Sequence, residues 1–586
     1  MKRLFLTITA LLMFVATMSA GGKLTLPDIT SGKFAAKTVN GINPIEGTDT
    51  YARISQDGER VVCCSFKTGK ELSVLFDVKN TMGCKIDGFD DYVLSPDGKR
   101  MLIQTKTERI YRRSFKADFY IYNIESRRLD RLSDGDKQQI PTWSPDGQQV
   151  AFVRGGNIFL VKLLYDNAEI QVTKDGKFNE VINGLPDWVN EEEFGFNSAL
   201  TFNADGTMIC WIRYDESKVK TYSLEMYKGM KPAKEEYAAY PGSYSYKYPK
   251  AGEDNSTVSA WSYDIKSHKI NRLQVPLDAD GYMPRIKPTN DPMRIVVYTM
   301  NRHQDDLCLY AVNPRSTVAQ LIIKEHVDKY VREEAMEGVK FVGDKILLPS
   351  DRSGYTKLYI YNMNGQLQRT IGDGNYDITS VYGYDPKTGD VYYQAAALGA
   401  TDRQVYVTHK NGKTVRLTDR EGWNTAFFSG DFQYFVNTWS DYNTPYVFTT
   451  RTREGKLINT IEDNKAVKQL VSDYGFCKRE PFSFTTSEGV VLNGWMVKPK
   501  DFDANKKYPV IMHQYSGPGS QQVTNSWSAG SMGQGGAFDS YLAQEGFIVV
   551  SVDGRGTGGR GSEFEKCTYL NLGNLESKDQ VETALY

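Results

Sequence analysis

The sequence predicts a β-propeller over residues 46–478, followed by a shorter α/β domain over residues 479–586. A turn phrase predicts the propeller: Ser-x-Asp-Gly ends at Gly58, Gly98 and Gly147, and a looser Asn-x-Asp-Gly copy ends at Gly206. Asp-Gly between strand-forming residues is typical of hairpin turns, because glycine adopts the positive φ that such turns need. The copies lie roughly 40 to 60 residues apart, which fits four-stranded blades with variable insertions.

Apolar or alternating stretches follow the turn phrase, and they have the length of single strands. Examples are residues 149–153 and 157–161. Segments 357–361 and 390–394 keep this character without the phrase. Few helical stripes interrupt the region up to about residue 475, so we expect a domain built from strands. These spacings leave the number of blades open.

The α/β prediction rests on continuous apolar strands that alternate with a helix near the end of the chain. We expect strands within 490–499, 508–513 and 546–552, and a helix near 538–544. Such strands are typical of a mostly parallel sheet that is covered on both faces. The last segment, 574–586, has helical character, and the sequence stops there without a glycine cap or a polar tail. We therefore expect the α/β domain to be truncated.

An export signal is predicted at residues 1–20. Lys2 and Arg3 precede an apolar run that reaches Met18, and small residues follow around Ala20. This order is typical of a secretory signal peptide, here with a cleavage site after Ala20. The alternative is an uncleaved membrane anchor, although the apolar run is short for a membrane-spanning helix. We expect a periplasmic or secreted protein in which residues 21–45 form an N-terminal segment.

The composition argues against several classes of function. The net charge of −1 provides no general attraction to nucleic acid or to acidic lipid. The seven cysteines include no Cys-x-x-Cys pair and the five histidines are dispersed, so we expect neither a metal site nor a cofactor. Residues 554–559 match the Gly-x-Gly-x-x-Gly spacing of a dinucleotide-binding turn, but no further strand with an acidic residue follows. The alternative is a glycine loop that lets the backbone pass close to a neighbouring site.

Three adjacent carboxylates, Glu191, Glu192 and Glu193, follow Asp187-Trp188 within the propeller region. Adjacent carboxylates repel one another, so this run is either a solvated turn or a socket for a positive charge. The residue pattern alone leaves both interpretations open. A nucleophilic serine turn of the form Gly-x-Ser-x-Gly does not occur in the sequence, and the segment 526–530 lacks the first glycine of that pattern.

The chain resembles dipeptidyl peptidase IV and its bacterial relatives over almost all of its length after the signal peptide. The resemblance is strongest in Asp187-Trp188-Val189 with the three glutamates, in Tyr508-Pro509 with Tyr515-Ser516-Gly517-Pro518, and in Asp553-Gly554-Arg555-Gly556-Thr557-Gly558. Residues 26–34 also resemble the family's short N-terminal helix, which packs near the hydrolase domain. The resemblance implies an eight-bladed propeller followed by an α/β-hydrolase domain that is cut before its nucleophile.

The resemblance also implies the residues of a peptide-binding site. The paired glutamates that bind the substrate's amino terminus correspond to Glu192 and Glu193. The substrate-orienting arginine corresponds to Arg112, with Arg113 as the neighbouring alternative, and the tyrosine of the oxyanion hole corresponds to Tyr515. The serine, aspartate and histidine of the family's catalytic triad have no counterpart in this sequence.

The implied function is a serine exopeptidase that releases Xaa-Pro or Xaa-Ala dipeptides from peptides with a free amino terminus. We expect this chain alone to be inactive, because the triad is missing. Homodimers are common in the family, so a homodimer is the implied assembly. One alternative is a binding protein or pseudo-enzyme that holds peptide amino termini without cutting them. Another is an oligopeptidase or acylaminoacyl peptidase of the same architecture, in which paired glutamates are not expected.

Overall fold

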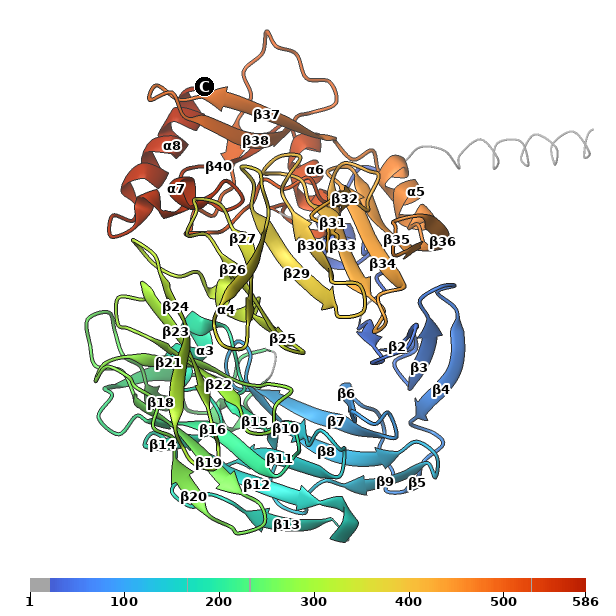
Figure 1. The fold of residues 1–586 in the computed structure, drawn as a ribbon. Helices are drawn as coiled ribbons and strands as arrows, with labels where there is room; N and C mark the ends of the chain where they lie inside the picture. Colours follow the sequence, from blue (N-terminus) through green and yellow to red (C-terminus); the bar gives the residue numbers. More distant parts are fainter. Residues whose placement is uncertain (1–21, 40, 166, 231–232, 528–529) are drawn as a thin grey trace, which may run out of the picture.

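The computed structural model describes residues 22–586 apart from 40, 166, 231–232 and 528–529, so the predicted signal peptide lies outside the described residues. The described chain forms a ring of β-sheets, with a smaller α/β part seated on one side of it (Figure 1). Eight sheets of the described chain form the blades of the ring, which confirms the predicted propeller and the blade number that the family resemblance implied.

Blades 1 to 4 contain, in chain order, β1 (Asn43–Pro44), β2 (Thr50–Ile54), β3 (Arg60–Ser65) and β4 (Glu71–Asp77); β5 (Met82–Gly83), β6 (Asp91–Leu94), β7 (Arg100–Arg109), β8 (Phe115–Asn123) and β9 (Arg128–Arg131); β10 (Gln139–Trp143), β11 (Gln149–Arg154), β12 (Asn157–Lys162) and β13 (Ala168–Gln171); and β14 (Val181–Asn183), β15 (Leu200–Phe202), β16 (Met208–Asp215), β19 (Thr257–Asp264) and β20 (Ile270–Arg272). A separate hairpin of β17 (Thr221–Met226) and β18 (Gly242–Lys247) extends from blade 4.

Blades 5 to 8 contain β21 (Tyr282–Pro288), β22 (Ile295–Met300), β23 (Asp306–Val312) and β24 (Ala319–His326); β25 (Lys340–Val342), β26 (Lys345–Ser350), β27 (Lys357–Asn362) and β28 (Leu367–Ile371); β29 (Ile378–Asp385), β30 (Asp390–Ala395), β31 (Gln404–Thr408) and β32 (Thr414–Arg416); and β33 (Trp423–Phe428), β34 (Tyr434–Asp441), β35 (Thr444–Thr452) and β36 (Leu457–Glu462). Two short helices interrupt the strands, α3 (Trp188–Phe194) in blade 4 and α4 (Glu333–Glu337) between blades 5 and 6.

The repeated turn phrase joins the same pair of strands in each of the first four blades. In blade 2, Ser95 Oγ donates to Asp97 Oδ1 at 2.6 Å, and the same oxygen accepts from the backbone of Lys99 at 3.1 Å. Gly98 completes the turn at a φ of 68°. The Asp carboxylate thus accepts hydrogen bonds from both sides of its own turn. This explains why serine, aspartate and glycine keep the same relative positions in each copy of the phrase.

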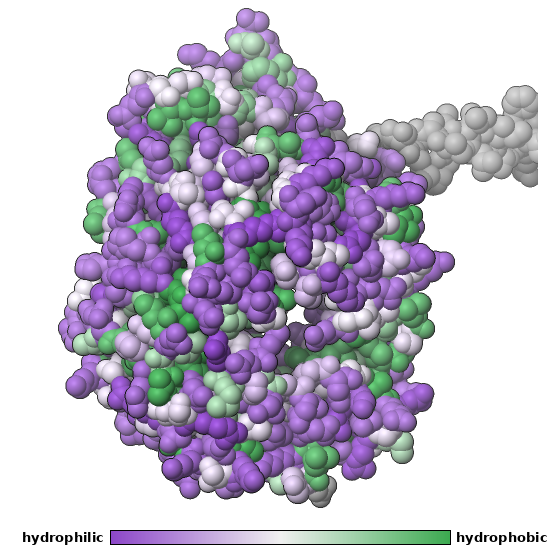
Figure 2. All heavy atoms as spheres, viewed as in Figure 1, coloured by the Kyte–Doolittle hydropathy of each residue, from purple (hydrophilic) through white to green (hydrophobic). Residues whose placement is uncertain are grey.

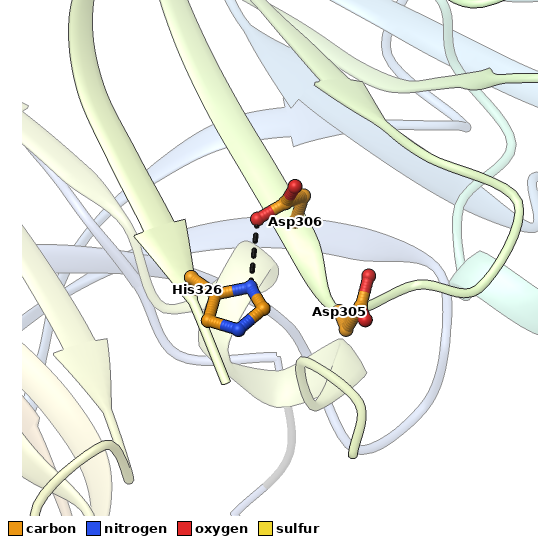
Figure 3. A group of neighbouring side chains, drawn as sticks. All are labelled: Asp305, Asp306 and His326. Carbon is orange, nitrogen blue, oxygen red and sulfur yellow. Dashed lines mark hydrogen bonds and ion pairs between the residues drawn. The ribbon is translucent and has the colours of Figure 1, made fainter. Parts of the chain in front are cut away.

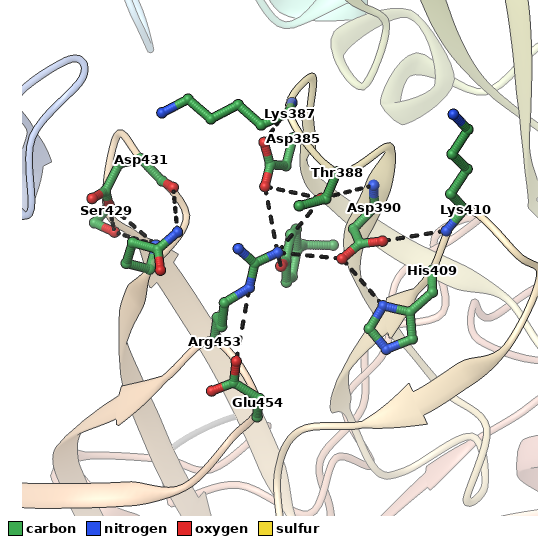
Figure 4. Close-up of polar contacts among 12 residues, drawn as sticks. Asp385, Lys387, Thr388, Asp390, His409, Lys410, Ser429, Asp431, Arg453 and Glu454 are labelled. Atoms are coloured by element: carbon green, nitrogen blue, oxygen red, sulfur yellow. Dashed lines mark hydrogen bonds and ion pairs between the residues drawn. The ribbon is translucent and has the colours of Figure 1, made fainter.

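Blade 8 contains a copy of this turn that the sequence pattern did not reveal. Ser429 Oγ donates to Asp431 Oδ1 at 2.6 Å between β33 and β34 (Figure 4). Phe432 takes the place of the glycine, at a φ of 56° that non-glycine residues seldom adopt. Its ring stacks on Tyr392 of blade 7 with a centroid distance of 5.1 Å. The contact between blades 7 and 8 therefore offsets the backbone strain at Phe432, which a glycine at this position would not have.

Buried apolar clusters join consecutive blades around the ring. The ring closes where Val436 of blade 8 shares a cluster with Tyr51 and Val62 of blade 1. Thr450 Oγ1 also donates to the carbonyl of Lys67 across this junction at 3.2 Å. Closure buries the apolar faces that the first and last blades of an open array would expose.

An ion-pair network adds a polar link between blades 7 and 8. Arg453 Nη2 lies 3.4 Å from Asp385 and 3.3 Å from Asp390, and it donates to the Tyr392 hydroxyl at 3.0 Å. His409 Nδ1 lies 3.1 Å from the same Asp390 carboxylate (Figure 4). The guanidinium therefore bridges the two blades through carboxylates that are themselves buried.

The α/β part follows α5 (Lys465–Asp473) and contains β37 (Arg479–Thr485), β38 (Val491–Val497), β39 (Val510–Met512), α6 (Ala537–Gln544), β40 (Ile548–Asp553), α7 (Ser562–Glu565) and α8 (Asn574–Leu585). Its strand order is β37-β38-β40-β39. The expectation of a mostly parallel sheet is wrong for these strands, because β37, β38 and β40 pair antiparallel and β39 with β40 forms the parallel pair. A tight turn at Gly489 makes β37 and β38 a hairpin, whereas the crossover through α6 permits a parallel pair.

The described N-terminal segment packs on this α/β part. Its helix α2 (Leu26–Thr30) starts at the N-cap Thr25 and carries a proline in its first turn. Leu24 and Phe34 are buried in one cluster with Ala537 of α6, and the backbone of Leu24 donates to Gln544 Oε1 at 2.9 Å. In the described chain no helix has the length and apolar character needed to cross a membrane. The face drawn in Figure 2 is mostly hydrophilic, with scattered apolar residues.

Ionic contacts seat the α/β part on blades 6 and 7. Arg332 Nη2 lies 2.5 Å from Glu565 Oε2, and Lys566 Nζ lies 2.6 Å from Asp351 Oδ2. The backbone of Gly561 donates to Asp377 Oδ2 at 2.8 Å. All these side chains are largely buried, so the contacts resist screening by salt.

Candidate functional site

The acidic stretch is a helix rather than a solvated turn. Asp187 caps the N-terminus of α3 by accepting from the backbone of Asn190 at 2.9 Å, and Gly195 ends the helix with a left-handed φ of 69°. The first glutamate, Glu191, is only 1% exposed. The interpretation as a solvated turn is therefore wrong, because the run is a helix capped at both ends and its first carboxylate is buried.

Glu191 is bound to the turn between β7 and β8. Its Oε1 accepts from the backbone of Arg113 at 2.7 Å and from the backbone of Ser114 at 2.8 Å. Arg113 Nη1 donates to the Glu191 carbonyl at 3.2 Å. The first carboxylate is thus a structural link between blade 2 and blade 4, and it holds the turn that carries Arg112.

Glu192 and Arg112, which the sequence predicted as site residues, are in direct contact. Arg112 Nε donates to Glu192 Oε2 at 2.9 Å, and Nη2 lies 2.7 Å from Oε1, so the pair is bidentate. The Arg112 side chain is 69% exposed and open to a ligand. Arg113 donates to the Glu191 carbonyl. Of the two arginines that the sequence left open, we therefore expect Arg112 to be the one that contacts a substrate.

Glu193 lies next to this pair and has no ion-pair or hydrogen-bond partner for its carboxylate within the described residues. Burial raises the pKa of Glu193, and the neighbouring Glu192 raises it further. A cation placed between the two carboxylates would relieve this repulsion. We therefore expect Glu192 and Glu193 to hold a positive charge, with Glu192 oriented by Arg112.

Tyr515 follows β39 at the carboxyl end of the strand, and the residue is 63% exposed. The loop behind it is held by Gly519, which donates to the Gly556 carbonyl at 2.9 Å, and by Gly558, which donates to the Ser520 carbonyl at 3.0 Å. A side chain at Gly558 would lie 2.6 Å from the Gly519 carbonyl oxygen. Residues 554–559 thus act as the glycine loop that lets two backbones pass closely.

Asp553 anchors the far end of the same loop. Its carboxylate accepts from the backbone of Gln522 at 2.9 Å and of Val523 at 2.8 Å, while burial raises the pKa of Asp553 to about 6. On the propeller side, Arg403 donates to Gln521 Oε1 at 2.8 Å. Sequence reasoning missed these supporting residues, because their roles depend on contacts between distant segments.

Among the described residues, no hydrogen bond or ion pair joins Tyr515 to Arg112, Glu192 or Glu193. Glu333 of α4 contacts Gly195 at the end of α3, and Glu334 of the same helix lines a cavity of about 500 Å³ that Gly519 also lines. The roles of Arg112, Glu192, Glu193 and Tyr515 remain predictions.

A buried carboxyl group near the cap of α3 should make stability depend on pH. Burial raises the pKa of Glu216 to about 7 from an ordinary value of 4.5; Asp187 adds to the rise and Lys247 opposes it. The folded state therefore binds the proton more tightly than the unfolded state does. The resulting stabilisation is present below about pH 4.5 and is lost as the pH rises through about 7.

We expect Glu216→Gln, which cannot ionise, to leave Tm nearly unchanged at pH 5 and to raise it at pH 8. The gain at pH 8 should be roughly 2 kcal/mol in the free energy of unfolding, after allowance for local relaxation. Thermal melts of both proteins at the two pH values measure this. Equal shifts of Tm at pH 5 and pH 8 would contradict the assignment.

One group of side chains in the described chain has the spacing of a metal site. The ligand atoms of Asp305, Asp306 and His326 all lie within 4.8 Å of one another (Figure 3). His326 Nδ1 is 2.8 Å from Asp306 Oδ1, and Lys324 Nζ is 3.0 Å from Asp306 Oδ2. Because Lys324 and His326 already pair with Asp306, we assign the group to local charge pairing at the β23–β24 hairpin.

Comparison with known proteins identifies the family. Residues 95–446 match the model of the "Dipeptidyl peptidase IV (DPP IV) N-terminal region", and residues 538–586 match the prolyl oligopeptidase family. A probable dipeptidyl peptidase 4 of Aspergillus flavus is 30% identical over 516 residues, covering 84% of this chain. Dipeptidyl peptidase 4 of Trichophyton equinum is 29% identical over 525 residues, covering 85% of this chain. The chain spans 65% of the length of each of these two relatives.

The crystal structure of Porphyromonas gingivalis dipeptidyl peptidase 4 is similar to this chain with a TM-score of 0.92 and 38% sequence identity, over 97% of this chain and 79% of that one. The match to the N-terminal-region model extends over more than half of the chain, and it includes the acidic helix α3 and the Arg112 turn. The resemblance noted from the sequence is confirmed: the chain belongs to the dipeptidyl peptidase IV family.

Proposed function

We propose that this chain provides the substrate-binding part of a dipeptidyl-peptidase-IV-like serine exopeptidase, which releases Xaa-Pro or Xaa-Ala dipeptides from the free amino terminus of peptides. The observation that carries the proposal is the bidentate Arg112–Glu192 pair beside the carboxylate of Glu193, which has no partner among the described residues. A peptide α-ammonium, with a pKa of about 8, is a cation that two carboxylates can share. The planar fork of Arg112 is then free to donate to a substrate carbonyl with its remaining N–H groups.

Tyr515 supplies the second half of the proposal. Its exposed hydroxyl would donate to the carbonyl oxygen that becomes negative in the tetrahedral intermediate, a contribution of roughly 3 kcal/mol for one such donor. Fixing the amino terminus on α3 and the scissile carbonyl at Tyr515 sets the number of residues between them. This distance makes the enzyme release dipeptides rather than longer fragments.

We also propose that the protein is exported. The basic residues Lys2 and Arg3, the apolar run and the small residues near Ala20 have the order of a secretory signal peptide. The test is to express the chain with a reporter and to sequence the amino terminus of the exported form, which should begin at Gly21.

Peptide binding should depend on a free amino terminus and on Glu193. We expect the full chain to bind a Gly-Pro pentapeptide, and N-acetylation of that peptide to weaken binding by at least tenfold, because the cation is removed. Glu193→Ala should weaken binding of the free peptide by a similar factor and leave the acetylated peptide unaffected. Calorimetric titration measures both.

Glu125→Ala is the matched control, since Glu125 is an exposed carboxylate in the turn between β8 and β9. This variant should bind both peptides as the unmodified chain does. If acetylated and free peptides bind with equal affinity, the proposed anchoring of amino termini is wrong.

A further inference from the structure

A tyrosine of the β17–β18 hairpin lies between the two segments that carry the candidate anchor residues. The hairpin is inserted between β16 and β19 of blade 4, and its two strands form a sheet of their own. Tyr246 of β18 is nevertheless only 8% exposed. The rings that surround it come from the start of α3, from the turn between β7 and β8, and from the hairpin itself.

On one side, Tyr246 contacts the first residue of α3. Its ring centroid lies 6.2 Å from that of Trp188, with the ring planes at 62°. Tyr248, which follows β18, stacks on the same indole with a centroid distance of 4.0 Å and meets Tyr246 edge to face at 5.9 Å. Aromatic pairs of these geometries attract one another beyond the effect of the area they bury. The hairpin therefore supports the end of α3 that precedes Glu192.

On the other side, Tyr246 contacts the turn that carries Arg112. Its ring centroid lies 5.8 Å from that of Tyr111, the residue directly before Arg112. The backbone directly after Arg112 is held separately, because the N–H of Arg113 donates to Glu191 Oε1 at 2.7 Å. The turn is thus fixed before Arg112 by an aromatic contact and after it by a carboxylate.

Hydrogen bonds on both sides of Tyr246 fix the strand that carries it. Asn179 Nδ2, from the loop before β14, donates to the carbonyl of Ser245 at 3.1 Å. Lys247 Nζ donates to the carbonyl of Val219, in the segment that leads into β17, at 2.6 Å. The Tyr246 ring is therefore held from a strand that is itself tied to the propeller, which allows it to support the turn and the helix at the same time.

We propose that Tyr246 is a positioning residue, which holds the Arg112 turn against α3 so that Arg112 keeps its bidentate contact with Glu192. The Arg112 side chain is 69% exposed, so the place of its guanidinium depends on the backbone that carries it. The inference rests on the proposed anchoring of free amino termini. It adds a residue that acts through Arg112 and does not itself touch the substrate.

Binding of the Gly-Pro pentapeptide and of its N-acetylated form to variants of the full chain tests this role. We expect Tyr246→Ala to weaken binding of the free peptide about tenfold and to leave the acetylated peptide unaffected, so that the preference for the free peptide falls by the same factor. Tyr246→Phe keeps the ring and should restore the preference. Tyr240→Ala is the control, because this tyrosine of the same insertion is 82% exposed, and it should leave both affinities unchanged.

A double-mutant cycle with Arg112→Ala separates positioning from a general loss of stability. If Tyr246 acts through Arg112, Tyr246→Ala should add less than twofold to the loss that Arg112→Ala causes by itself. Circular dichroism at the titration temperature shows that each variant is folded. Tyr246→Leu, which keeps apolar bulk without the ring, replaces Tyr246→Ala if that variant does not fold.

Two results overturn the positioning role and leave the anchor intact. One is a Tyr246→Ala chain that prefers the free peptide as strongly as the unmodified chain does. The other is a full tenfold effect of Tyr246→Ala in the Arg112→Ala background. If the unmodified chain binds free and acetylated peptides equally, the anchor itself is wrong, and the role of Tyr246 is wrong with it.

Discussion

Residues 1–586 on their own are expected to release no detectable product from a Gly-Pro p-nitroanilide reporter. The sequence has no Gly-x-Ser-x-Gly turn, and no histidine follows His513. In the family this chain belongs to, the implied nucleophile is an activated serine, and removing the triad of a serine hydrolase costs about 10⁶ in turnover. If Tyr515 and the acidic helix position a substrate as proposed, they still contain no group that attacks its carbonyl.

Absorbance of the released nitroaniline over many hours measures this, with buffer alone as the reference. The same preparation must bind the unlabelled Gly-Pro pentapeptide in a manner sensitive to N-acetylation, so that inactivity is not mistaken for misfolding. Turnover well above the buffer rate, in a preparation free of other peptidases, would show that the chain carries a nucleophile that we have not identified.

Glu191→Ala is expected to destabilise the propeller by about 3 kcal/mol, because the buried backbone N–H of Ser114 and the partly buried one of Arg113 lose a charged acceptor. The same change frees the turn that presents Arg112, so the bidentate pair with Glu192 should also loosen. We therefore expect a lower Tm together with weaker binding of free amino termini. Thermal melting and peptide titration of one preparation measure the two effects.

Glu193→Ala provides the contrast, since it removes an adjacent carboxylate that has no partner within the described chain. This variant should bind free peptides at least tenfold more weakly and keep the Tm of the unmodified protein. If Glu191→Ala melts at the same temperature as the unmodified chain, the assignment of Glu191 as a structural link between blades 2 and 4 is incorrect.

The architecture was largely predictable because its signals are local. The Asp in the turn at Gly98 and its equivalents bonds within a few residues of itself, so a short phrase marks each blade. The copy in blade 8 escaped detection because Phe432 adopts glycine's conformation with help from Tyr392 in the neighbouring blade. The antiparallel pairing of β38 with β40 was likewise hidden, because it depends on strand order rather than on strand composition.

The candidate site was predictable only through resemblance. The residue pattern could not separate Glu191, which is buried against two backbone amides, from Glu192, which pairs with Arg112, and Glu193, which is exposed. That difference depends on a turn about 80 residues away in the chain.

The closure of the ring between Thr450 and Lys67 also has a kinetic consequence. The two residues are 383 positions apart, so during synthesis at 5–20 residues per second blade 1 must wait roughly 20 to 80 s for blade 8 to emerge. During that interval the face of blade 1 that packs on blade 8 has no partner. Contacts of such long sequence separation also form slowly. Nascent chains should therefore be most prone to aggregation just before the eighth blade appears, and chaperones that bind exposed strands should act on them at that stage.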